Sequence, residues 1–406
     1  MRVLIVGSGG REHALAWKLS QSPLLEELHA APGNPGIAAL GQCHPVHADD
    51  GEGLLGLAHA LEVDLAVIGP EAPLVAGVAD ELRHAGIPAF GPSAAAARIE
   101  GSKSFAKDVL AAAGIPAAAA LDELQAPCVV KADGLAAGKG VFVCHTQEEL
   151  DAGLAAAAAL GGEVVVEELL EGPELSVFAL CDGSRALPVA AARDYKRIGD
   201  GDTGPNTGGM GGFSPVPPFL GAELASLVEQ IHQPVLDELA ARGTAFTGLL
   251  YAGLMLTDEG PRVLEFNCRF GDPETQAVLP CLDGDLLAAL VAAASGDLAE
   301  SSLAPGDRSA VTIALTAGSY PEGRDAGSPI SGTADAEALG ALVFHAGTAR
   351  RGGELVTSGG RILNVTGVGD DLDQARALAY EGARAISFDG MRYRADIGLA
   401  ESHVAG

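Results

Sequence analysis

The chain has 406 residues, 48% of them hydrophobic, so two to four domains with sizeable buried cores are possible. This ordinary globular composition excludes disorder, collagen and coiled coil for the chain as a whole. There are 25 lysines and arginines against 54 aspartates and glutamates, and the net charge of −29 would repel phosphate backbones and anionic lipids. Nucleic acid and membrane surfaces are therefore poor candidate partners.

No segment reads as a membrane span or a leader. The apolar run 286–294 is far shorter than the roughly 20 residues that cross a bilayer. The run 3–6 is too short for the core of a signal peptide, so we expect a cytoplasmic protein. The six cysteines form no C-x-x-C pair and predict neither a disulfide framework nor a zinc site; we expect them to be small buried residues.

Residues 1–100 predict a Rossmann-like parallel sheet with crossover helices. Short apolar runs at 3–6 and 65–68 alternate with amphipathic stretches, one after Gly10 and one around 75–84. Glycine-containing turns follow both runs, where ligands bind in open α/β sheets. We place a domain boundary near residue 100.

Residues 101–310 predict a second domain, with a small α+β lobe at about 118–188. Four strands, at 128–132, 141–144, 164–168 and 175–181, would surround an alanine-rich helix at 150–160. Glycine occupies seven of the fourteen positions in 199–212, so this segment should bury little and stay mobile unless a ligand orders it. A hairpin is expected from strands 249–256 and 262–267.

Residues 311–406 predict a third, mainly β-rich domain. Strand patterns at 311–316, 342–345 and 362–365 precede one convincing helix. In that helix Leu372, Ala379 and Ile386 fall on one face.

Lysine is scarce, and its distribution points to a phosphate site. The chain has only six lysines, at 18, 103, 107, 131, 139 and 196. Lys131 and Lys139 flank the glycine loop of 129–141, where backbone N–H groups could approach phosphate oxygens while lysine supplies charge. The loop is not a Walker A motif, because Gly140 replaces Ser or Thr and no helix follows. A hairpin with solvated lysines is the alternative.

Glu265 and Asn267 predict a site for a hard cation. Residues two apart on a strand point to the same face, and magnesium prefers oxygen ligands. Taken alone, the pattern more readily describes a polar strand face in solvent. Arg269 and Asp272 follow at once and bring further charge to the strand end.

Residues 193–197 place three cations, among them Lys196 and Arg197, beside Asp194 and before the glycine-rich segment. Positive charge next to a mobile loop is what a lid over phosphates needs. A solvated turn followed by a linker is the alternative.

The first turn, Gly7-Ser8-Gly9-Gly10, does not complete a dinucleotide motif, because G-x-G-x-x-G requires glycine where the chain has Glu12. It can still offer a helix N-terminus to a small phosphate, or serve only as a tight turn. His13, on the following helix, is more readily explained by packing or local hydrogen bonding than by catalysis.

Together these blocks resemble those of the ATP-grasp ligases, and among them the glycinamide ribonucleotide synthetase (phosphoribosylamine–glycine ligase) family. The resemblance runs in order from residue 7 to residue 276, through long and specific motifs. These are GSGGREHA at 7–14, GSK at 101–103, the loop at 131–141, VEELLEG at 166–172, DTGPNTGGMG at 202–211 and RFGDPETQ at 269–276.

The resemblance implies a central ATP-grasp fold between the Rossmann-like domain and the β-rich C-terminal domain. It implies that ATP, with Mg²⁺ or Mn²⁺, phosphorylates glycine, and that 5-phosphoribosylamine then attacks the acyl phosphate. The product is glycinamide ribonucleotide, in purine biosynthesis. A monomer is implied as well. Such a reaction needs cations on the triphosphate, exclusion of water and an oriented amine.

The family's functional residues carry over to matching positions of this chain. Arg269, Lys196 and Asp194 would act in catalysis, and Glu265 with Asn267 would hold the metal. The implied ATP contacts are Lys103, Lys131, Lys139, Glu167, Glu168, Leu169, Leu170 and Glu174. The implied substrate contacts are Gly9, Gly10, Arg11, Glu12, His13, Arg197 and Asp272.

The resemblance has local departures. Family members usually have histidine at the position of Tyr195 and often glutamine at that of Arg193, which leaves the substrate contacts there open. Three other functions are weighed: another ATP-grasp carboxylate–amine ligase, a non-catalytic nucleotide sensor, and a Rossmann oxidoreductase. Glu12 counts against the oxidoreductase, and the intact Glu265–Asn267 pair counts against the sensor.

Overall fold

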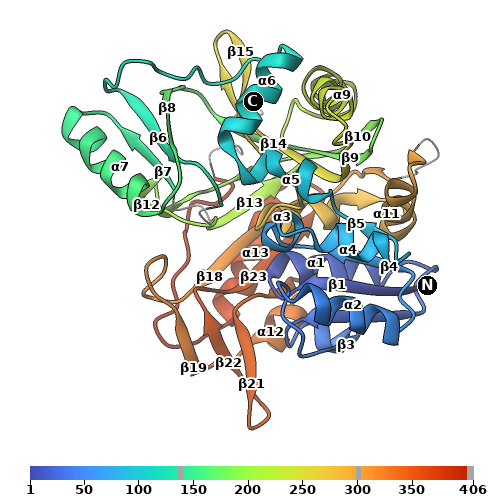
Figure 1. The fold of residues 1–406 in the computed structure, drawn as a ribbon. Helices are drawn as coiled ribbons and strands as arrows, with labels where there is room; N and C mark the ends of the chain where they lie inside the picture. The colour runs from blue at the N-terminus through green and yellow to red at the C-terminus, as the bar shows by residue number, and fades with distance from the viewer. Residues whose placement is uncertain (136–139, 299–302, 400–406) are drawn as a thin grey trace.

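The N-terminal region of the computed structural model, which describes residues 1–135, 140–298 and 303–399, is a five-stranded parallel sheet. Its order is β3-β2-β1-β4-β5, and it lies at the lower right in Figure 1. The strands are β1 (Arg2–Gly7), β2 (Glu27–Pro32), β3 (Gln42–Cys43), β4 (Leu65–Ile68) and β5 (Ala89–Phe90). The Rossmann-like prediction is confirmed.

The helices of this region are α1 (Gly10–Leu19), α2 (Gly51–Ala60), α3 (Glu71–Val75) and α4 (Val78–His84). The helix expected around 75–84 is confirmed as α4, but it begins only at Val78, because Gly77 before it has φ +93°. Only glycine adopts that conformation at little cost. Two further helices, α5 (Ala94–Gly101) and α6 (Lys103–Ala113), lead into the next region, and the Ser102 hydroxyl caps α6 by accepting from Phe105 N.

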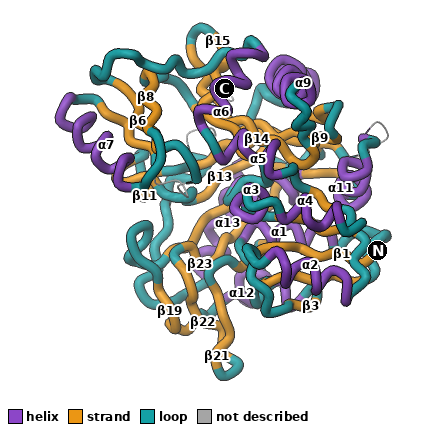
Figure 2. The backbone as a smooth tube through the Cα atoms, viewed as in Figure 1, coloured by secondary structure: helices purple, strands orange, loops and turns teal. Residues whose placement is uncertain are grey.

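A small lobe follows, at the upper left in Figure 2. It consists of β6 (Cys128–Ala132), β7 (Val141–Cys144) and β8 (Val164–Glu168), in the order β7-β6-β8, with α7 (Gln147–Ala159) packed on them. The strand expected at 175–181 does not belong to this lobe. It is β9 (Glu174–Asp182), and it pairs in the large sheet because its side chains are buried along almost its whole length.

The large sheet has eight strands in the order β15-β14-β9-β10-β13-β18-β23-β20. Their bounds are β10 (Ala186–Asp194), β13 (Gly211–Ser214), β14 (Thr247–Thr257), β15 (Gly260–Asn267), β18 (Ser309–Thr316), β20 (Leu342–His345) and β23 (Arg361–Gly369). The predicted β14–β15 hairpin is confirmed. The C-terminal strands continue this sheet through the β13–β18 pairing.

The remaining helices cover the large sheet and its ends. They are α8 (Gly221–Leu227), α9 (Gln233–Ala241), α10 (Glu274–Val278), α11 (Leu286–Ser295), α12 (Thr333–Ala338) and α13 (Leu372–Ala385). The predicted C-terminal helix is α13, which packs on β18 and β23. Within the described ranges, no helix is both long and apolar enough to cross a membrane.

Three small antiparallel sheets complete the fold. They pair β11 (Arg197–Gly199) with β12 (Thr203–Asn206), β16 (Leu282–Asp283) with β17 (Ala304–Pro305), and β22 (Glu354–Gly359) with both β19 (Asp325–Pro329) and β21 (Thr348–Arg351). Five of the six cysteines are buried and Cys43 is partly buried, as expected.

The glycine-rich segment 199–212 has more structure than its composition predicts. Its first half lies in the β11–β12 hairpin, and its last two residues begin β13. Residues 200–205 are exposed, as expected for a segment that buries little, but Thr207 and 209–212 are buried, so the expectation is wrong for the second half. The partners that cover it come from the C-terminal region: Tyr320 Oη accepts from Gly208 N at 2.8 Å, and Arg361 donates to the Gly209 carbonyl at 3.4 Å.

Candidate functional site

The turn between β1 and α1 is built around the side chain of Glu12. Glu12 Oε2 accepts from the Gly9 backbone N–H at 2.6 Å, and Glu12 Oε1 pairs with Arg11. A Cβ atom at either Gly7 or Gly69 would clash with this carboxylate, so glycine allows Glu12 to fill the crevice between β1 and β4. A dinucleotide pyrophosphate would need that space, and this counts against an oxidoreductase.

Arg269 lies between two carboxylates. Its Nε donates to Glu71 and its Nη2 to Glu100, each at 3.1 Å. Although burial lowers the pKa of Arg269, Glu100 and Glu71 more than offset this and raise it further above its ordinary value. Arg11 reaches the same place by donating to the Phe270 carbonyl at 3.1 Å, so the predicted catalytic arginine and the first turn share one cluster.

The lysines predicted for ATP line the junction of the small lobe and the large sheet. Lys131 Nζ lies 2.7 Å from Glu167 Oε2 and donates to the Leu264 carbonyl at 3.0 Å. The other oxygen of Glu167 lies 2.8 Å from Lys107 Nζ. Lys103 Nζ donates to the Gly134 carbonyl at 3.1 Å. Lys139 lies outside the described residues.

The other residues predicted for ATP follow β8. Glu168 ends that strand and pairs with Arg262 at 2.7 Å, so its side chain is engaged away from the lysine cluster. Leu169 and Leu170 connect β8 towards β9, and Leu170 is buried. Glu174 begins β9 and contacts Lys196 Nζ.

Asp194 and Lys196, the predicted catalytic pair, lie at the end of β10 and just beyond it. Burial raises the pKa of Asp194 to about 7, and Glu274 adds to the rise while Lys196 opposes it. Burial lowers the pKa of Lys196, but Asp194 and Glu174 outweigh this and place it well above its ordinary value. The pair combines a carboxyl that titrates near neutrality with a permanent cation.

The predicted metal residues both lie on β15, where Asn267 is buried and Glu265 is partly exposed. Burial alone would raise the pKa of Glu265. Lys196, Lys131 and Lys103 together bring it below its ordinary value, so the carboxylate is charged. In the parts of the chain that the structure describes, no group of three or more His, Cys, Asp or Glu side chains could hold a metal.

Sequence reasoning missed a buried chain of hydrogen bonds beneath these residues. The Tyr251 hydroxyl donates to Glu274 Oε1 at 2.8 Å and lies 2.8 Å from Ser176 Oγ. All three side chains are buried. Glu274 was visible within the RFGDPETQ block, but nothing in the spacing of the sequence joins it to β9 and β14.

Asp272 borders a polar cavity of about 350 Å³ between the N-terminal turn and the C-terminal strands. Arg361 Nη2 lies 3.0 Å from Asp272 Oδ2, and although burial raises the pKa of Asp272, Arg361 and Arg11 hold it below its ordinary value. Sequence reasoning missed Arg361 and most of the lining. The lining residues are Ser8, Gly9, Gly33, Asn34, Asp272, Ala346, Gly347, Thr348, Ser358 and Arg361.

Of the remaining predicted substrate residues, only Gly9 lines this cavity. Gly10 lies behind it, where a Cβ would clash with Gln276 and Asn364. His13 is buried and accepts from the backbone N–H of His345 at 2.8 Å, as its packing role predicts. Arg197 donates to the Gly204 carbonyl within its own hairpin.

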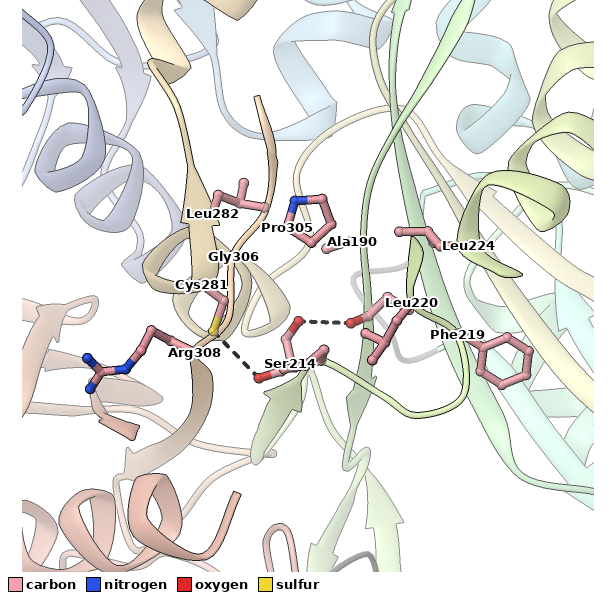
Figure 3. A pocket seen from close by; sticks show the side chains of 12 residues that line it. Ala190, Ser214, Phe219, Leu220, Leu224, Cys281, Leu282, Pro305, Gly306 and Arg308 are labelled. Atoms are coloured by element: carbon pink, nitrogen blue, oxygen red, sulfur yellow. Dashed lines mark hydrogen bonds between the residues drawn. The ribbon is translucent and has the colours of Figure 1, made fainter. Parts of the chain in front are cut away.

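A second cavity has a mainly apolar lining, which includes the charged side chain of Arg308. Figure 3 shows it between β10 and the segment around Cys281, where Ser214 donates to the Ala191 carbonyl. It encloses about 10 Å³, which is room for one water molecule. It is too small for an organic substrate.

Comparison with known proteins identifies the family. Three models of phosphoribosylglycinamide synthetase match consecutive parts of the chain: the N domain over residues 1–100, the ATP-grasp (A) domain over 101–275 and the C domain over 310–400. The chain belongs to this family. The family resemblance read from the motifs is thereby confirmed.

Relatives and solved structures agree with this family membership. Proteins named phosphoribosylamine–glycine ligase from Brucella melitensis and Streptomyces coelicolor are 49% and 50% identical to this chain, covering 98% of it and 97% and 98% of their own lengths. The crystal structure of that ligase from Thermotoga maritima is 35% identical, with a TM-score of 0.85, and covers 98% of this chain and 100% of its own.

More distant structures share the fold alone. The biotin carboxylase domain of 2-oxoglutarate carboxylase from Hydrogenobacter thermophilus, solved with MgADP, is 16% identical with a TM-score of 0.71. It covers 96% of this chain and 91% of its own. The predicted combination of a Rossmann-like sheet, an ATP-grasp fold and a β-rich C-terminal region is confirmed.

Proposed function

We propose that this chain ligates glycine to 5-phosphoribosylamine and converts ATP to ADP and phosphate, in de novo purine biosynthesis. The observation that carries the proposal is the position of Lys131, which donates to the Leu264 carbonyl beside Glu265, together with Lys103 and Lys196, whose charges help to lower the pKa of Glu265. Full-length similarity to ligases of this name supports the choice of substrates. We also propose a monomeric, cytoplasmic enzyme with domains 1–100, 101–310 and 311–406.

The ATP site is proposed at the junction of the small lobe and the large sheet. Lys103 and Lys131, with Lys139, would neutralise the phosphates. Backbone groups of 167–170 would receive the adenine, and Glu174 would accept from the ribose hydroxyls. For this last role the Glu174 carboxylate has to share its contact with Lys196.

Glu265 and Asn267 fit Mg²⁺ or Mn²⁺. One charged carboxylate and one amide oxygen on the same strand face suit a hard cation that takes its other ligands from phosphates and water. When bound, such a cation supplies charge neutralisation on the triphosphate.

The chemistry needs two displacements. A carboxylate oxygen of glycine attacks the γ-phosphorus, and the bond to ADP breaks. The amine of the ribosylamine then attacks the carbonyl carbon of glycyl phosphate; phosphate leaves, and the nitrogen loses a proton. Lys196 and Arg269 would stabilise the transferred charge, and Asp194, with a pKa of about 7, would accept the proton.

The 350 Å³ cavity is the proposed place for the sugar phosphate. It borders the N-terminal end of α1 at Gly9, where the helix dipole favours an anion, and Arg361, which pairs with Asp272, lines it. Arg11, Glu12, His13 and Arg197 would act around its edge, by fixing the first turn and the hairpin.

The test measures ADP release with ATP and Mg²⁺ while glycine and phosphoribosylamine, formed in place from ribose 5-phosphate and ammonia, are added singly and together. We expect release to require both. Glu265→Gln should remove release under every condition and leave the protein folded. ATP binding without release when both substrates are present would indicate a nucleotide sensor, and release with a different acid or amine would indicate another ATP-grasp ligase.

A further inference from the structure

We propose that Arg394 is a positioning residue for this reaction: it joins the C-terminal segment to the β11–β12 hairpin and so fixes the backbone that carries Lys196 and Arg197. The inference rests on the proposed function, because it assigns a role within that reaction. This contact joins distant parts of the sequence, because Arg394 donates to the carbonyl of Arg197, which lies 197 residues earlier in the chain.

The guanidinium of Arg394 is fixed on every side. Its side chain is 1% exposed, and its Nε and Nη2 donate to the two oxygens of Asp396 at 2.7 and 2.6 Å. Its Nη1 donates to the Arg197 carbonyl at 3.0 Å and to Asp202 Oδ1 at 2.8 Å. The planar guanidinium donates in fixed directions, so these bonds fix the orientation of its partners as well as their distance. The ammonium group of a lysine could not do this.

The same segment holds the tip of the hairpin. Asp396 Oδ2 accepts from Gly201 N at 2.8 Å, and Asp200 Oδ1 accepts from Ala395 N at 2.8 Å. Asp202, at φ +53°, adopts a left-handed conformation that is uncommon for residues other than glycine. Its ion pair with Arg394 therefore helps to hold a conformation that the free hairpin would leave.

The hairpin leads directly to the reacting groups. The Lys196 carbonyl accepts from both the backbone N–H and the hydroxyl of Thr207, each at 2.8 Å, while the next carbonyl, that of Arg197, is held by Arg394. The Lys196 backbone is thus fixed on both sides, and its ammonium contacts Glu174. Loss of the Arg394 side chain would release the backbone at Arg197, the residue next to Lys196.

Tyr195 belongs to the same assembly. Its hydroxyl accepts from Gly398 N at 3.0 Å, and the Arg394 guanidinium lies 4.9 Å from the centre of its ring. Tyr195 therefore adds a contact between the chain just before the hairpin and the C-terminal segment.

A loosened hairpin should admit water to the acyl phosphate. Water then replaces the amine: its oxygen bonds to the carbonyl carbon, the bond from that carbon to the phosphate oxygen breaks, and glycine and phosphate are regenerated with release of protons. ATP is consumed without ligation, so the ratio of ADP to ligated product rises above that of the coupled reaction.

The experiment compares Arg394→Met and Arg394→Lys in the full chain with Arg392→Met. Arg392 is exposed, lies two residues away and donates to the Gly318 carbonyl instead. We expect Arg394→Met to lower turnover to product by roughly tenfold or more and to raise the ADP-to-product ratio, because small displacements at a reacting site cost this much. Arg394→Lys should rescue neither value fully, and Arg392→Met should change neither.

Two further measurements keep the inference testable. Asp202→Asn, an exposed partner, should shift the same ratio in the same direction if the buried Arg394→Met does not fold. Trypsin should cleave after Arg197 faster in Arg394→Met and in Asp202→Asn than in the unmodified chain. This readout does not depend on which reaction the protein catalyses. An unchanged ratio together with unchanged cleavage in folded variants would overturn the role of Arg394. An unmodified chain without release dependent on both substrates would overturn the proposed function and, with it, any role in that reaction.

Discussion

The carboxylate of Glu167 illustrates how a single buried side chain can orient a cation. It lies between Lys107 and Lys131, at 2.8 and 2.7 Å, and is almost fully buried. Two ammonium groups in a partly desolvated place need this negative charge, because burying them unpaired would be costly. The sequence suggested a role for Glu167 through its backbone, and the structure adds this role for its side chain.

Replacing Glu167 by Gln should weaken ATP binding. The amide cannot balance two ammonium groups, so Lys131 is expected to leave its present position, and the KM for ATP should rise by about tenfold or more, as for loss of one partner of a buried ion pair. Glu168→Gln is the matched control, because Glu168 pairs with Arg262 where both side chains are partly exposed. Steady-state kinetics of both variants decide the matter; equal effects would contradict the bridging role.

Because His13 is buried, we expect the protein to lose stability in acid. Burial lowers its pKa to about 3 from an ordinary 6.5, so the native state stays neutral while the unfolded chain binds a proton below pH 6.5. Stability therefore falls as pH drops from 6.5 towards 3, and the contribution lost at pH 5 is about 2 kcal/mol. Protonation would also remove the acceptor that holds His345 N.

This pH dependence can be measured by urea unfolding at pH 7 and pH 5. His13→Gln removes one titrating group and should reduce the change by about 2 kcal/mol, leaving the part that buried His232 and His345 contribute through their lowered pKa values. His59→Gln, at an exposed position on α2, should leave the change as it was. A slope that is identical in the unmodified chain and in His13→Gln would show that other groups cause the acid effect.

For the secondary-structure elements, the local sequence pattern located most strands but did not show which strands pair with each other. The runs at 128–132, 249–256 and 362–365 became strands because period and β-branched content are properties of the segment itself. By contrast, β9 was assigned to the wrong sheet, and β13 was not recognised, since its pairing depends on β10 and β18 from distant parts of the chain. The scarcity of lysine in the sequence singled out the lysines of the proposed ATP site, whereas Arg361, Tyr251 and Arg394 belong to no local sequence pattern.

The close approach of α1 to β4 yields a prediction at the same scale. Gly69→Ala would place a methyl group against the Glu12 carboxylate, break its bond to Gly9 N and destabilise the protein by about 1–3 kcal/mol, as overpacking usually does. Gly56→Ala, in α2 with open space around it, should instead stabilise by about 0.5–1 kcal/mol. Thermal and urea unfolding would test both; destabilisation of equal size by the two changes would contradict a specific clash.

For the whole molecule, the continuous sheet joins regions that the sequence divides. One apolar core contains Leu4 from β1, Val177 from β9 and Val365 from β23, so the N-terminal, central and C-terminal regions share buried contacts. The geometry of the proposed substrate site depends on these shared contacts, because residues of all three regions line the 350 Å³ cavity. With a net charge of −29, the few lysines near Glu265 also concentrate positive charge where anionic substrates would bind.

The small lobe has a core of its own, and this separation predicts how the molecule opens. Its buried apolar residues are Cys128, Val130, Ala132, Cys144, Leu150, Ala157 and Val166. A core so small supports less local stability than the large shared one, so amides of β6 and β8 should exchange hydrogen faster than those of β9 and β14. Hydrogen exchange read by mass spectrometry on the full chain tests this, with β9 and β14 as internal controls.

If ATP binds at the proposed junction, it should protect the lobe selectively. Lys131, on β6, contacts the Leu264 carbonyl of the large sheet, and Glu167, on β8, pairs with Lys131. Addition of ATP with Mg²⁺ is expected to slow exchange in β6 and β8 and to leave β9 and β14 nearly unchanged. Equal protection of both sheets by ATP would instead mean that the lobe unfolds only together with the rest of the protein. Equal exchange rates in the absence of ATP would contradict the lower stability of the lobe's core.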